Sequence, residues 1–373
     1  MDNYKNQFNN IYKNKKVLIT GHTGFKGSWL SLWFLELGAD VIGYSLEPPT
    51  EPNLFDSMKL KNKITHIIGD VRDEKNLFSV FKKYKPEFVF HLAAQPLVRL
   101  SYKDPKLTYE TNIMGTVNVL ETVRKTNSVK VCIVITSDKC YENKEWVYGY
   151  RENDAIGGYD PYSSSKGCAE LIITAYRNSF FNPKDYGKTH NVILSSVRAG
   201  NVVGGGDWRE DRIVPDCIKM LYQKKEIFIR NPNAIRPWQY ILEPLWGYLL
   251  LGSKMYKYKD GVKYNSAWNF GPNDENIITV NELVKLIIKN WGSGTYKVDN
   301  SNNPHEANLL KLDISKARTL LGWKPVYNIY ETIERTINWY RNFYNGIKKE
   351  KLYKITANEI CDYVKHLNKN YNK

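Results

Sequence analysis

Residues 17–27 read VLITGHTGFKG, and the prediction of the fold starts from this stretch. An apolar strand runs into three glycines spaced three residues apart, Gly21, Gly24 and Gly27, and an apolar helix is expected over residues 27–37. The first glycine permits a tight turn, the second lets the backbone approach a pyrophosphate, and the third lets the helix pack closely on the sheet. The start of the helix then directs free N–H groups at the phosphates. The stretch therefore predicts a dinucleotide-binding loop.

Strand and helix patterns alternate from residue 16 to residue 136. Apolar strands are expected at 40–44, 65–68, 88–92 and 129–136, with helices at 74–84 and 105–126. Strands that are apolar on both faces are typical of a parallel sheet covered by helices on each side. We therefore predict an α/β fold with a Rossmann-like, doubly wound parallel sheet.

The pattern loosens beyond residue 198, where we expect a smaller substrate lobe that is interleaved with the last strands. The predicted divisions are an N-terminal tail (1–15), a dinucleotide-binding domain (16–198), a substrate lobe (199–345) and a C-terminal extension (346–373). Residues 267–270 are expected to return a strand to the main sheet. Further helices are expected at 213–223, 242–255, 279–291, 314–321 and 355–367.

Composition limits the class of protein. The 373 residues are 42% apolar and 25% charged, which is ordinary for a globular chain. No apolar run reaches about 18 residues and the polar start lacks a signal segment, so we expect a cytoplasmic protein that spans no membrane. Five scattered cysteines and six unclustered histidines predict reduced thiols and no metal site. The net charge of +15 is dispersed, without an arginine-rich stripe, so no nucleic-acid partner is expected.

Residues 162–166, YSSSK, form the second informative motif. Tyr162 and Lys166 are four residues apart and would share one face of a helix. An ammonium near a phenol favours the phenolate and lowers the pKa of the tyrosine from about 10. Such a tyrosine can take a hydroxyl proton while hydride leaves the same carbon for a nicotinamide. A surface Tyr/Lys pair is the alternative, but the dinucleotide fold before it favours the catalytic interpretation.

Ser137, Asp138 and Lys139 follow the strand expected at 129–136. Ligands of open α/β sheets bind at the carboxyl ends of the strands. We interpret Asp138 and Lys139 as a candidate acid and base beside the tyrosine, against the alternative that Asp138 caps a turn.

The candidate cofactor-binding residues lie in the glycine loop, at the following strand ends and in the YSSSK motif. They are Gly21, Thr23, Gly24, Phe25, Lys26, Gly27, Asp70, Val71, Leu92, Ala93, Ala94, Tyr162 and Lys166. Ser45 stands where a ribose-binding acid is usual, with Glu47 close behind it, and no arginine lies nearby in the sequence for a 2′-phosphate. We therefore expect NAD and not NADP.

Arg236 is the first candidate for the phosphates of a substrate, because its planar fork suits phosphate oxygens. Asn201 and Arg212 are weaker candidates, as is Arg198, which could equally bridge the two lobes from the end of a strand. Gln95 and His305 complete the candidate substrate-binding residues.

Several motifs, taken together, resemble a known family. GHTGFKG (21–27), HLAAQ (91–95), YSSSK (162–166) and the helix that contains Asn112 resemble the extended short-chain dehydrogenase/reductases over residues 15–345. YSLEPP (44–49), TSDKCY (136–141), GNVVGGGDW (200–208) and RPWQY (236–240) are similar to the nucleotide-sugar 4,6-dehydratases that act on CDP-glucose. The resemblance implies an NAD-dependent lyase that forms a 4-keto-6-deoxy sugar for surface polysaccharides. It also implies a homodimer or higher oligomer through the helices at 105–126 and 162–178.

The resemblance assigns roles to single residues. Tyr162 would deprotonate the 4-hydroxyl of the sugar, Ser137 would hydrogen-bond to that oxygen, and Asp138 would protonate the departing 6-hydroxyl. Lys166 would bind the nicotinamide ribose and tune Tyr162. Relatives that act on dTDP-glucose or GDP-mannose carry glutamate at the position of Lys139, as the base at C5, whereas the CDP-glucose branch carries this lysine. Whether Lys139 removes the C5 proton or polarises a water or the ketone stays open.

Three alternatives to CDP-glucose dehydration remain. The chain could be a 4,6-dehydratase for another nucleotide sugar, or a sugar-nucleotide 4-epimerase, which shares Tyr162 and Lys166 but needs no acid and base at residues 138 and 139. The third alternative is a non-catalytic NAD-binding regulator or a nucleic-acid-binding relative. The intact Ser137, Tyr162 and Lys166 disfavour it, as does the absence of a concentrated basic patch.

Overall fold

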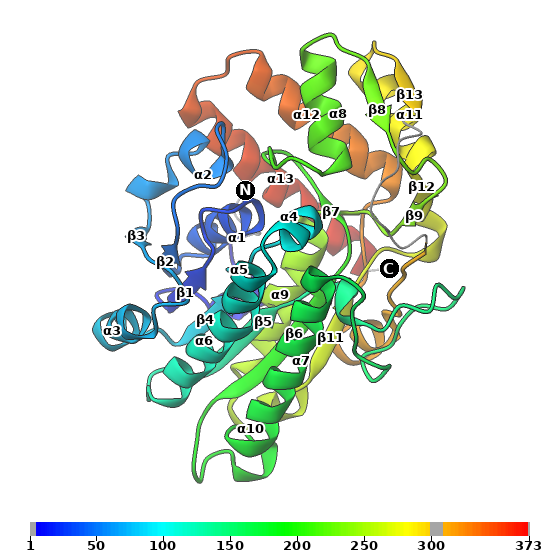
Figure 1. Cartoon of the computed structure of the whole chain (residues 1–373). Coiled ribbons are helices and arrows are strands. Elements are labelled where there is room, and N and C mark those ends of the chain that lie inside the picture. The colour runs from blue at the N-terminus through cyan, green and yellow to red at the C-terminus, as the bar shows by residue number, and fades with distance from the viewer. Residues whose placement is uncertain (1–4, 299–308, 372–373) are drawn as a thin grey trace.

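The computed structural model describes residues 5–298 and 309–371, and its centre is a sheet of seven parallel strands (Figure 1). Their spatial order is β11-β6-β5-β4-β1-β2-β3, with every neighbouring pair parallel. The strands are β1 (Lys16–Thr20), β2 (Asp40–Ser45), β3 (Thr65–Ile68), β4 (Phe88–His91), β5 (Val131–Ile135), β6 (Ile193–Ala199) and β11 (Ala267–Phe270). This order reverses direction between β1 and β4, as in a doubly wound sheet, so the predicted fold class is confirmed.

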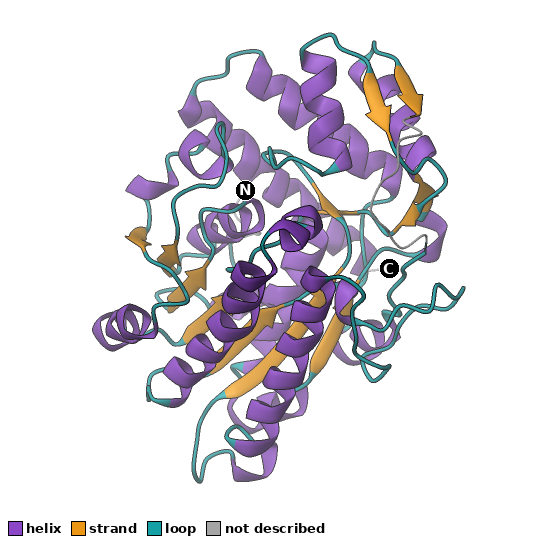
Figure 2. Ribbon diagram, viewed as in Figure 1, coloured by secondary structure: helices purple, strands orange, loops and turns teal. Residues whose placement is uncertain are grey.

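Helices cover both faces of the sheet (Figure 2). They are α1 (Phe25–Glu36), α3 (Glu74–Tyr84), α5 (Pro105–Tyr109), α6 (Gly115–Arg124), α7 (Pro161–Ser179) and α9 (Leu242–Met255). Leu18 of β1 faces α3, α6 and α7, whereas Val17 and Ile19 of the same strand face α1 and α9. Because side chains alternate along a strand, a continuously apolar strand supplies two cores at once.

A second group of elements lies above the carboxyl ends of the strands, in the upper part of Figure 1. It comprises β7 (Val202–Val203), α8 (Ile213–Tyr222), β8 (Ile227–Ile229), β9 (Ile235–Arg236), β10 (Gln239–Tyr240), β12 (Ile278–Thr279), α11 (Val280–Trp291), β13 (Tyr296–Val298) and α12 (Ile329–Tyr344). The short strands pair as β7 with β10, β8 with β13 and β9 with β12. The strand expected at 267–270 is β11, which joins the main sheet beside β6.

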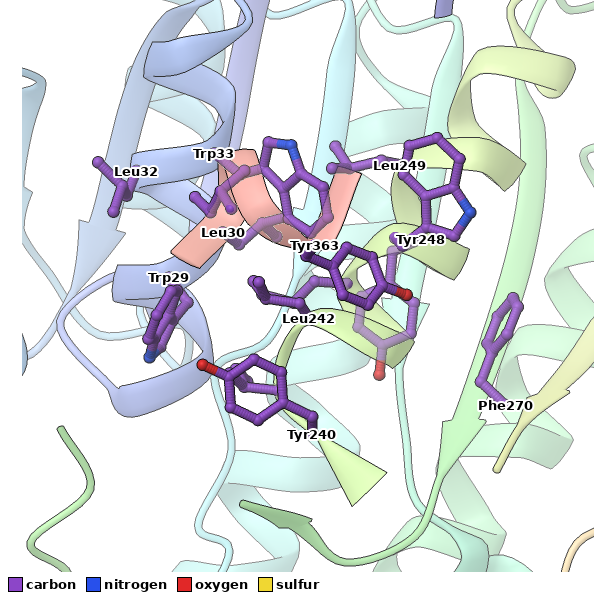
Figure 3. Close-up of a cluster of buried hydrophobic side chains, with 14 of the residues drawn as sticks. Trp29, Leu30, Leu32, Trp33, Tyr240, Leu242, Tyr248, Leu249, Phe270 and Tyr363 are labelled. Carbon is purple, nitrogen blue, oxygen red and sulfur yellow. The ribbon is translucent and has the colours of Figure 1, made fainter. Parts of the chain in front are cut away.

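Helix α13 (Lys349–Tyr371) is longer than the expected helix at 355–367. Figure 3 shows its Tyr363 among buried side chains of α1 and α9. The Tyr363 ring meets Trp33 edge-on at 5.9 Å, and its hydroxyl donates to Glu243 Oε2 at 2.7 Å. Tertiary packing thus extends this helix beyond its apolar sequence pattern. No helix within residues 5–298 and 309–371 is long and apolar enough to cross a lipid bilayer.

The helix expected at 105–126 runs without a break over residues 105–124, but a π turn over Glu110–Met114 separates its α-helical parts, α5 and α6. Asn112 lies in the π turn and bonds to both backbone groups of Gln95, at 2.8 and 3.0 Å, and to Ser165 Oγ at 2.8 Å. The extra residue of the π turn directs this amide into the space between β4 and α7. Residues on three elements around the strand ends are thereby tied together.

Candidate active site

A cavity of about 920 Å³ lies at the carboxyl ends of the strands, below α8 and β8. Except for Arg198, the sequence-predicted site residues within the described ranges line it, whereas His305 lies outside those ranges. The lining candidates are Gly21, Thr23, Gly24, Phe25, Lys26, Gly27, Asp70, Val71, Leu92, Ala93, Ala94, Gln95, Ser137, Asp138, Lys139, Tyr162, Lys166, Asn201, Arg212 and Arg236. Segments far apart in the sequence therefore share one site.

The glycine loop forms a cradle that fits a dinucleotide. Gly21 has a φ of +77°, and a Cβ atom there would lie 2.8 Å from the backbone nitrogen of Ala93. A Cβ atom on Gly27 would lie 2.1 Å from the Gly21 carbonyl oxygen. Helix α1 begins at Phe25, two residues earlier than predicted, and no side chain caps its first turn. Its N–H groups are therefore available to phosphate oxygens, as in dinucleotide-binding folds.

The far end of the cradle holds the residues expected near the adenosine ribose. Thr23 Oγ1 lies 2.9 Å from both Ser45 Oγ and the Leu46 carbonyl oxygen. An arginine distant in the sequence, Arg72, also lines this cavity, because the strand that precedes it, β3, pairs with β2. Arg72 Nη2 lies 2.7 Å from Asp70 Oδ2. Burial favours a raised pKa for Asp70, but the bonds from Arg72 hold it below its ordinary value.

The turn after β5 carries the proposed acid. Ser137 Oγ donates to Asp138 Oδ1 at 2.8 Å and accepts from the Lys139 backbone N–H at 3.2 Å. Asp138 is 4% exposed, and its Oδ2 has no hydrogen-bond partner in the described part of the chain. Burial raises the pKa of Asp138, although the Ser137 bond and the charge of Lys139 oppose the shift. A carboxyl group whose pKa is raised in this way holds its proton more readily, which suits it to act as a general acid.

Tyr162 and Lys166 lie one turn apart on α7 and both reach the cavity. The expectation that Lys166 pulls the tyrosine pKa below 10 is not met. Burial raises the pKa of Tyr162 to about 12, and the opposing influences are the Ser137 hydrogen bond and the charge of Arg212. Burial also lowers the pKa of Lys166 to about 8, against the charge of Glu170. Loss of hydration on burial is thus the largest influence on the pKa values of both Tyr162 and Lys166.

Basic side chains gather at the substrate end of the cavity. Arg212 Nη1 lies 2.6 Å from Asp207 Oδ2, while Arg209 and Arg236 line the cavity beside it. Burial, and then the charge of Arg212, lowers the pKa of Lys26 to about 8. This concentration of positive charge favours an anionic ligand.

The side chains of two residues that the sequence predicted to bind substrate, Gln95 and Arg198, bond to other parts of the protein. Gln95 Oε1 accepts from the Leu97 N–H at 2.6 Å, and its Nε2 donates to Leu97 and Thr108. Arg198 is turned away from the cavity and pairs with Glu170 at 2.8 Å. The expected bridge between the two lobes is therefore not observed, because Arg198 pairs with α7 of its own domain.

Sequence reasoning missed Glu170, Asp207 and Arg209. Glu170 follows Lys166 by four residues, so helical periodicity was the available signal for it. Asp207 and Arg209 lie in an irregular loop after the triple glycine, where no periodicity applies.

Comparisons with known proteins agree with this site. The sequence model of the family described as GDP-mannose 4,6 dehydratase matches residues 18–336. A CDP-glucose 4,6-dehydratase from Salmonella typhimurium is 51% identical over 95% of this chain and 98% of its own length. A putative UDP-glucose 4-epimerase from Methanocaldococcus jannaschii is 29% identical over 87% of this chain and 98% of its own.

Solved structures of similar shape carry the same fold. A UDP-glucose 4-epimerase from Thermotoga maritima has a TM-score of 0.75 at 24% identity, covering 88% of this chain and 99% of its own. A dTDP-glucose 4,6-dehydratase from Bacillus anthracis, in complex with NAD, has a TM-score of 0.72 at 20% identity, covering 90% and 99%. The family match extends over most of the chain, and the 51% identity extends over nearly all of it. This chain belongs to the GDP-mannose 4,6 dehydratase family.

Proposed function

We propose that this protein is an NAD-dependent hydro-lyase that converts CDP-glucose to CDP-4-dehydro-6-deoxyglucose. The observation that carries the proposal is the meeting of Tyr162, Lys166 and the Ser137–Asp138–Lys139 turn in the cavity that also contains the glycine cradle. The 51% identity to a CDP-glucose 4,6-dehydratase supports this substrate over other nucleotide sugars. Asp138 and Lys139 favour dehydration over 4-epimerisation, which requires no acid and base for C5–C6 elimination.

The residues that would hold NAD are those of the glycine cradle, the Thr23–Ser45 pair and the small side chains after β4. The chemistry that NAD supplies when bound is reversible hydride acceptance, from C4 of the sugar at first and back to C6 at the end. Tyr162 takes the proton of the 4-hydroxyl, and Ser137 holds that oxygen through its hydroxyl group. Lys166 lies one turn further along α7 in the same cavity, where its amine would bind the nicotinamide ribose.

Elimination follows from the ketone at C4, which acidifies the proton at C5. Asp138 protonates the departing 6-hydroxyl, so one water is lost as the C5 proton and the C6 hydroxyl. Its buried position and unpartnered Oδ2 support this role. The proton returned to C5 completes the 4-keto-6-deoxy sugar.

Lys139 is our candidate for the C5 side of the elimination. Its side chain lines the cavity directly after Asp138. Two roles remain for it, removal of the C5 proton and electrostatic stabilisation of the enolate that forms. Both roles use the amine of Lys139. They differ in whether the amine itself takes the C5 proton.

We propose a homodimer as the assembly. Helix α7 packs against α5 and the π turn that follows α5, and apolar side chains of the π turn and of α7 stay exposed. Met114 is 50% exposed and Leu171 is 59% exposed. Burying such side chains against a second copy would remove them from water.

We propose a cytoplasmic location and a role in making deoxysugars for surface polysaccharides such as O-antigens. All five cysteines are unpaired, and Cys132, Cys140 and Cys217 are buried. Unpaired thiols suit a reducing compartment. The substrate carries an activating nucleotide, so the keto product is available for further enzymatic reactions at C4.

The test is incubation with NAD and, separately, CDP-, dTDP-, UDP- and GDP-linked hexoses, followed by product mass. Loss of one water with CDP-glucose supports the proposal. Loss of water with another donor alone would reassign the substrate, and conversion without a mass change would indicate epimerisation. Turnover of none of them would contradict an enzymatic role in this class.

A further inference from the structure

Asp211 lies between two arginines, and all three side chains line the cavity. Its Oδ1 atom is 3.4 Å from Arg99 Nη1 and 3.3 Å from Arg230 Nη2, so both guanidinium groups approach the same oxygen. The side chains of Arg99, Asp211 and Arg230 are 34%, 36% and 31% exposed, whereas Tyr162 is 8% exposed. These three residues, the Asp211 cluster, therefore lie nearer to solvent than Tyr162 does.

The two arginines come from different parts of the fold. Arg99 lies on α4 (Val98–Lys103), which packs against α5 and α7 on the sheet. Arg230 directly follows β8, which pairs with β13 in the group of elements above the strand ends. Asp211 lies in the loop before α8. The Asp211 cluster therefore joins the helices on the sheet to the elements above the cavity.

Helix α4 is itself attached to the start of the helix that carries Tyr162. The Oγ atom of Ser101 accepts a hydrogen bond from the Tyr162 N–H at 3.1 Å and donates one to the Val98 carbonyl at 2.6 Å. Ser101 is fully buried, so bulk water does not compete for these bonds. The position of Arg99, two residues before Ser101 on the same short helix, is thereby fixed relative to Tyr162.

The backbone at Asp211 lets two neighbouring side chains bond to different partners. Asp211 has a φ of 59°, in the left-handed region that Asp and Asn adopt more readily than most residues. The next residue, Arg212, pairs with Asp207 at 2.6 Å. The loop is thus held both through Asp207 and through the two arginines of the Asp211 cluster.

We propose that Asp211 is a positioning residue that holds the elements above the cavity against the helix that carries Tyr162. It acts through Arg99 on one part of the fold and through Arg230 on the other. In an enzyme of the proposed function, this contact sets the position of the bound sugar nucleotide relative to the Tyr162 hydroxyl. That catalytic consequence rests on the proposed function, whereas the contact between the two parts of the fold does not.

Because two arginines share one carboxylate, removal of its charge affects both of them. A half-exposed ion pair contributes little to global stability, so its loss is expected to change local opening more than unfolding. Without the charge of Asp211, Arg99 and Arg230 face each other as two cations and repel. Salt screens exposed charges, so high ionic strength weakens the Asp211 cluster in the wild-type protein.

Hydrogen–deuterium exchange read by mass spectrometry tests this contact without relying on turnover. The two reporting segments are residues 97–104, which contain α4, and residues 208–216, which contain Asp211. The variants are D211N, R99Q and the double variant R99Q/D211N. Asn tolerates the left-handed backbone of residue 211, so D211N removes the charge without imposing strain. E210Q is the matched control, since Glu210 lies in the same loop but pairs with Lys219.

We expect exchange in both segments to speed up about fivefold in D211N and about twofold in R99Q, which leaves the Arg230 pair in place. The double variant should exchange no faster than D211N, because the Arg99 pair is already lost there. E210Q should exchange like the wild type. Raising the salt concentration from about 0.05 to 0.5 M should speed exchange in the wild type and not in D211N.

Faster exchange of residues 208–216 alone in D211N would overturn the proposal, since Asp211 would then stabilise only its own loop. An unchanged segment 208–216 in R99Q would overturn it as well. With CDP-glucose, D211N should lower kcat several-fold, and E210Q should not. Absence of turnover in the wild type, with exchange altered in both segments of D211N, would contradict the proposed function and leave the contact through Asp211 established.

Discussion

Asp207 links the catalytic cavity to helix α12 through two different partners. Its Oδ2 lies 2.6 Å from Arg212 Nη1, while its backbone carbonyl and N–H both bond to the hydroxyl of Tyr340. Asp207 is 5% exposed, so this arrangement is largely shielded from water. Helix α12 therefore fixes the direction of the arginine whose charge acts on Tyr162.

We predict that Asp207→Asn releases Arg212 and raises the KM for CDP-glucose by about tenfold, because the guanidinium loses its charged partner in a shielded site. Steady-state kinetics at fixed pH would measure this. Glu210→Gln is the matched control, since Glu210 lies in the same loop and pairs with Lys219 on the surface. Equal KM values for D207N and E210Q would contradict the assigned role of Asp207.

The glycine cradle allows a graded test. In Gly27→Ala the new Cβ atom would lie 2.1 Å from the Gly21 carbonyl oxygen, so the loop must move and NAD affinity should fall by more than about tenfold. In Gly24→Ala the nearest atom is 3.3 Å away, so a smaller loss is expected. Calorimetric titration with NAD measures both. The opposite ranking would refute the cradle geometry.

Much of the fold could be predicted from the sequence, because strands buried on both faces leave an unmistakable apolar pattern. Strands β3 and β11 and helices α3 and α9 have the predicted bounds. The π turn around Asn112 was missed, because it depends on bonds to Gln95 and Ser165 that form only in the folded chain.

Site residues that belong to a sequence motif could be predicted. Site residues that only the folding of the chain brings together could be predicted less well. The glycine loop, Tyr162 and the Ser137 turn meet in one cavity, as their positions at strand ends indicate. Arg72 was not considered, because it is distant in sequence from Ser45, yet parallel pairing of β2 and β3 brings the segment after β3 to the same cavity. The high pKa of Tyr162 was missed because burial cannot be read from a local motif.

Lys139 can be assigned a role by substitution. We predict that Lys139→Gln slows dehydration by about a hundredfold or more, whereas Lys139→Glu retains part of the rate, because a carboxylate can also accept the C5 proton. Product analysis in deuterated water measures the rate and the label at C5 together. If K139E is as slow as K139Q while the fold is intact, the positive charge is what matters, and proton removal by residue 139 is contradicted.

Because Glu243 is buried, we predict that the free energy of unfolding depends on pH. Burial raises its pKa from 4.5 to about 7, against bonds from Tyr327, Tyr363 and Val326. The folded state therefore keeps a proton that the unfolded state releases, so the free energy of unfolding falls as pH rises from 4.5 to 7, by about 3 kcal/mol. Urea unfolding between pH 5 and 8 measures this slope.

In Glu243→Gln this part of the slope should disappear, because residue 243 no longer titrates. The exposed Glu210→Gln variant should keep the wild-type slope. A wild-type slope in E243Q would mean that another group carries the pH dependence.

The most direct test of the proposed reaction uses CDP-glucose that carries deuterium at C4. Intramolecular oxidation and return predict a product lighter by one water, with the deuterium now on C6, and both are read from one mass and fragmentation spectrum. A product of unchanged mass, or a dehydrated product without deuterium at C6, would contradict a 4,6-dehydration in which Tyr162 and the Ser137–Lys139 turn act on one bound sugar.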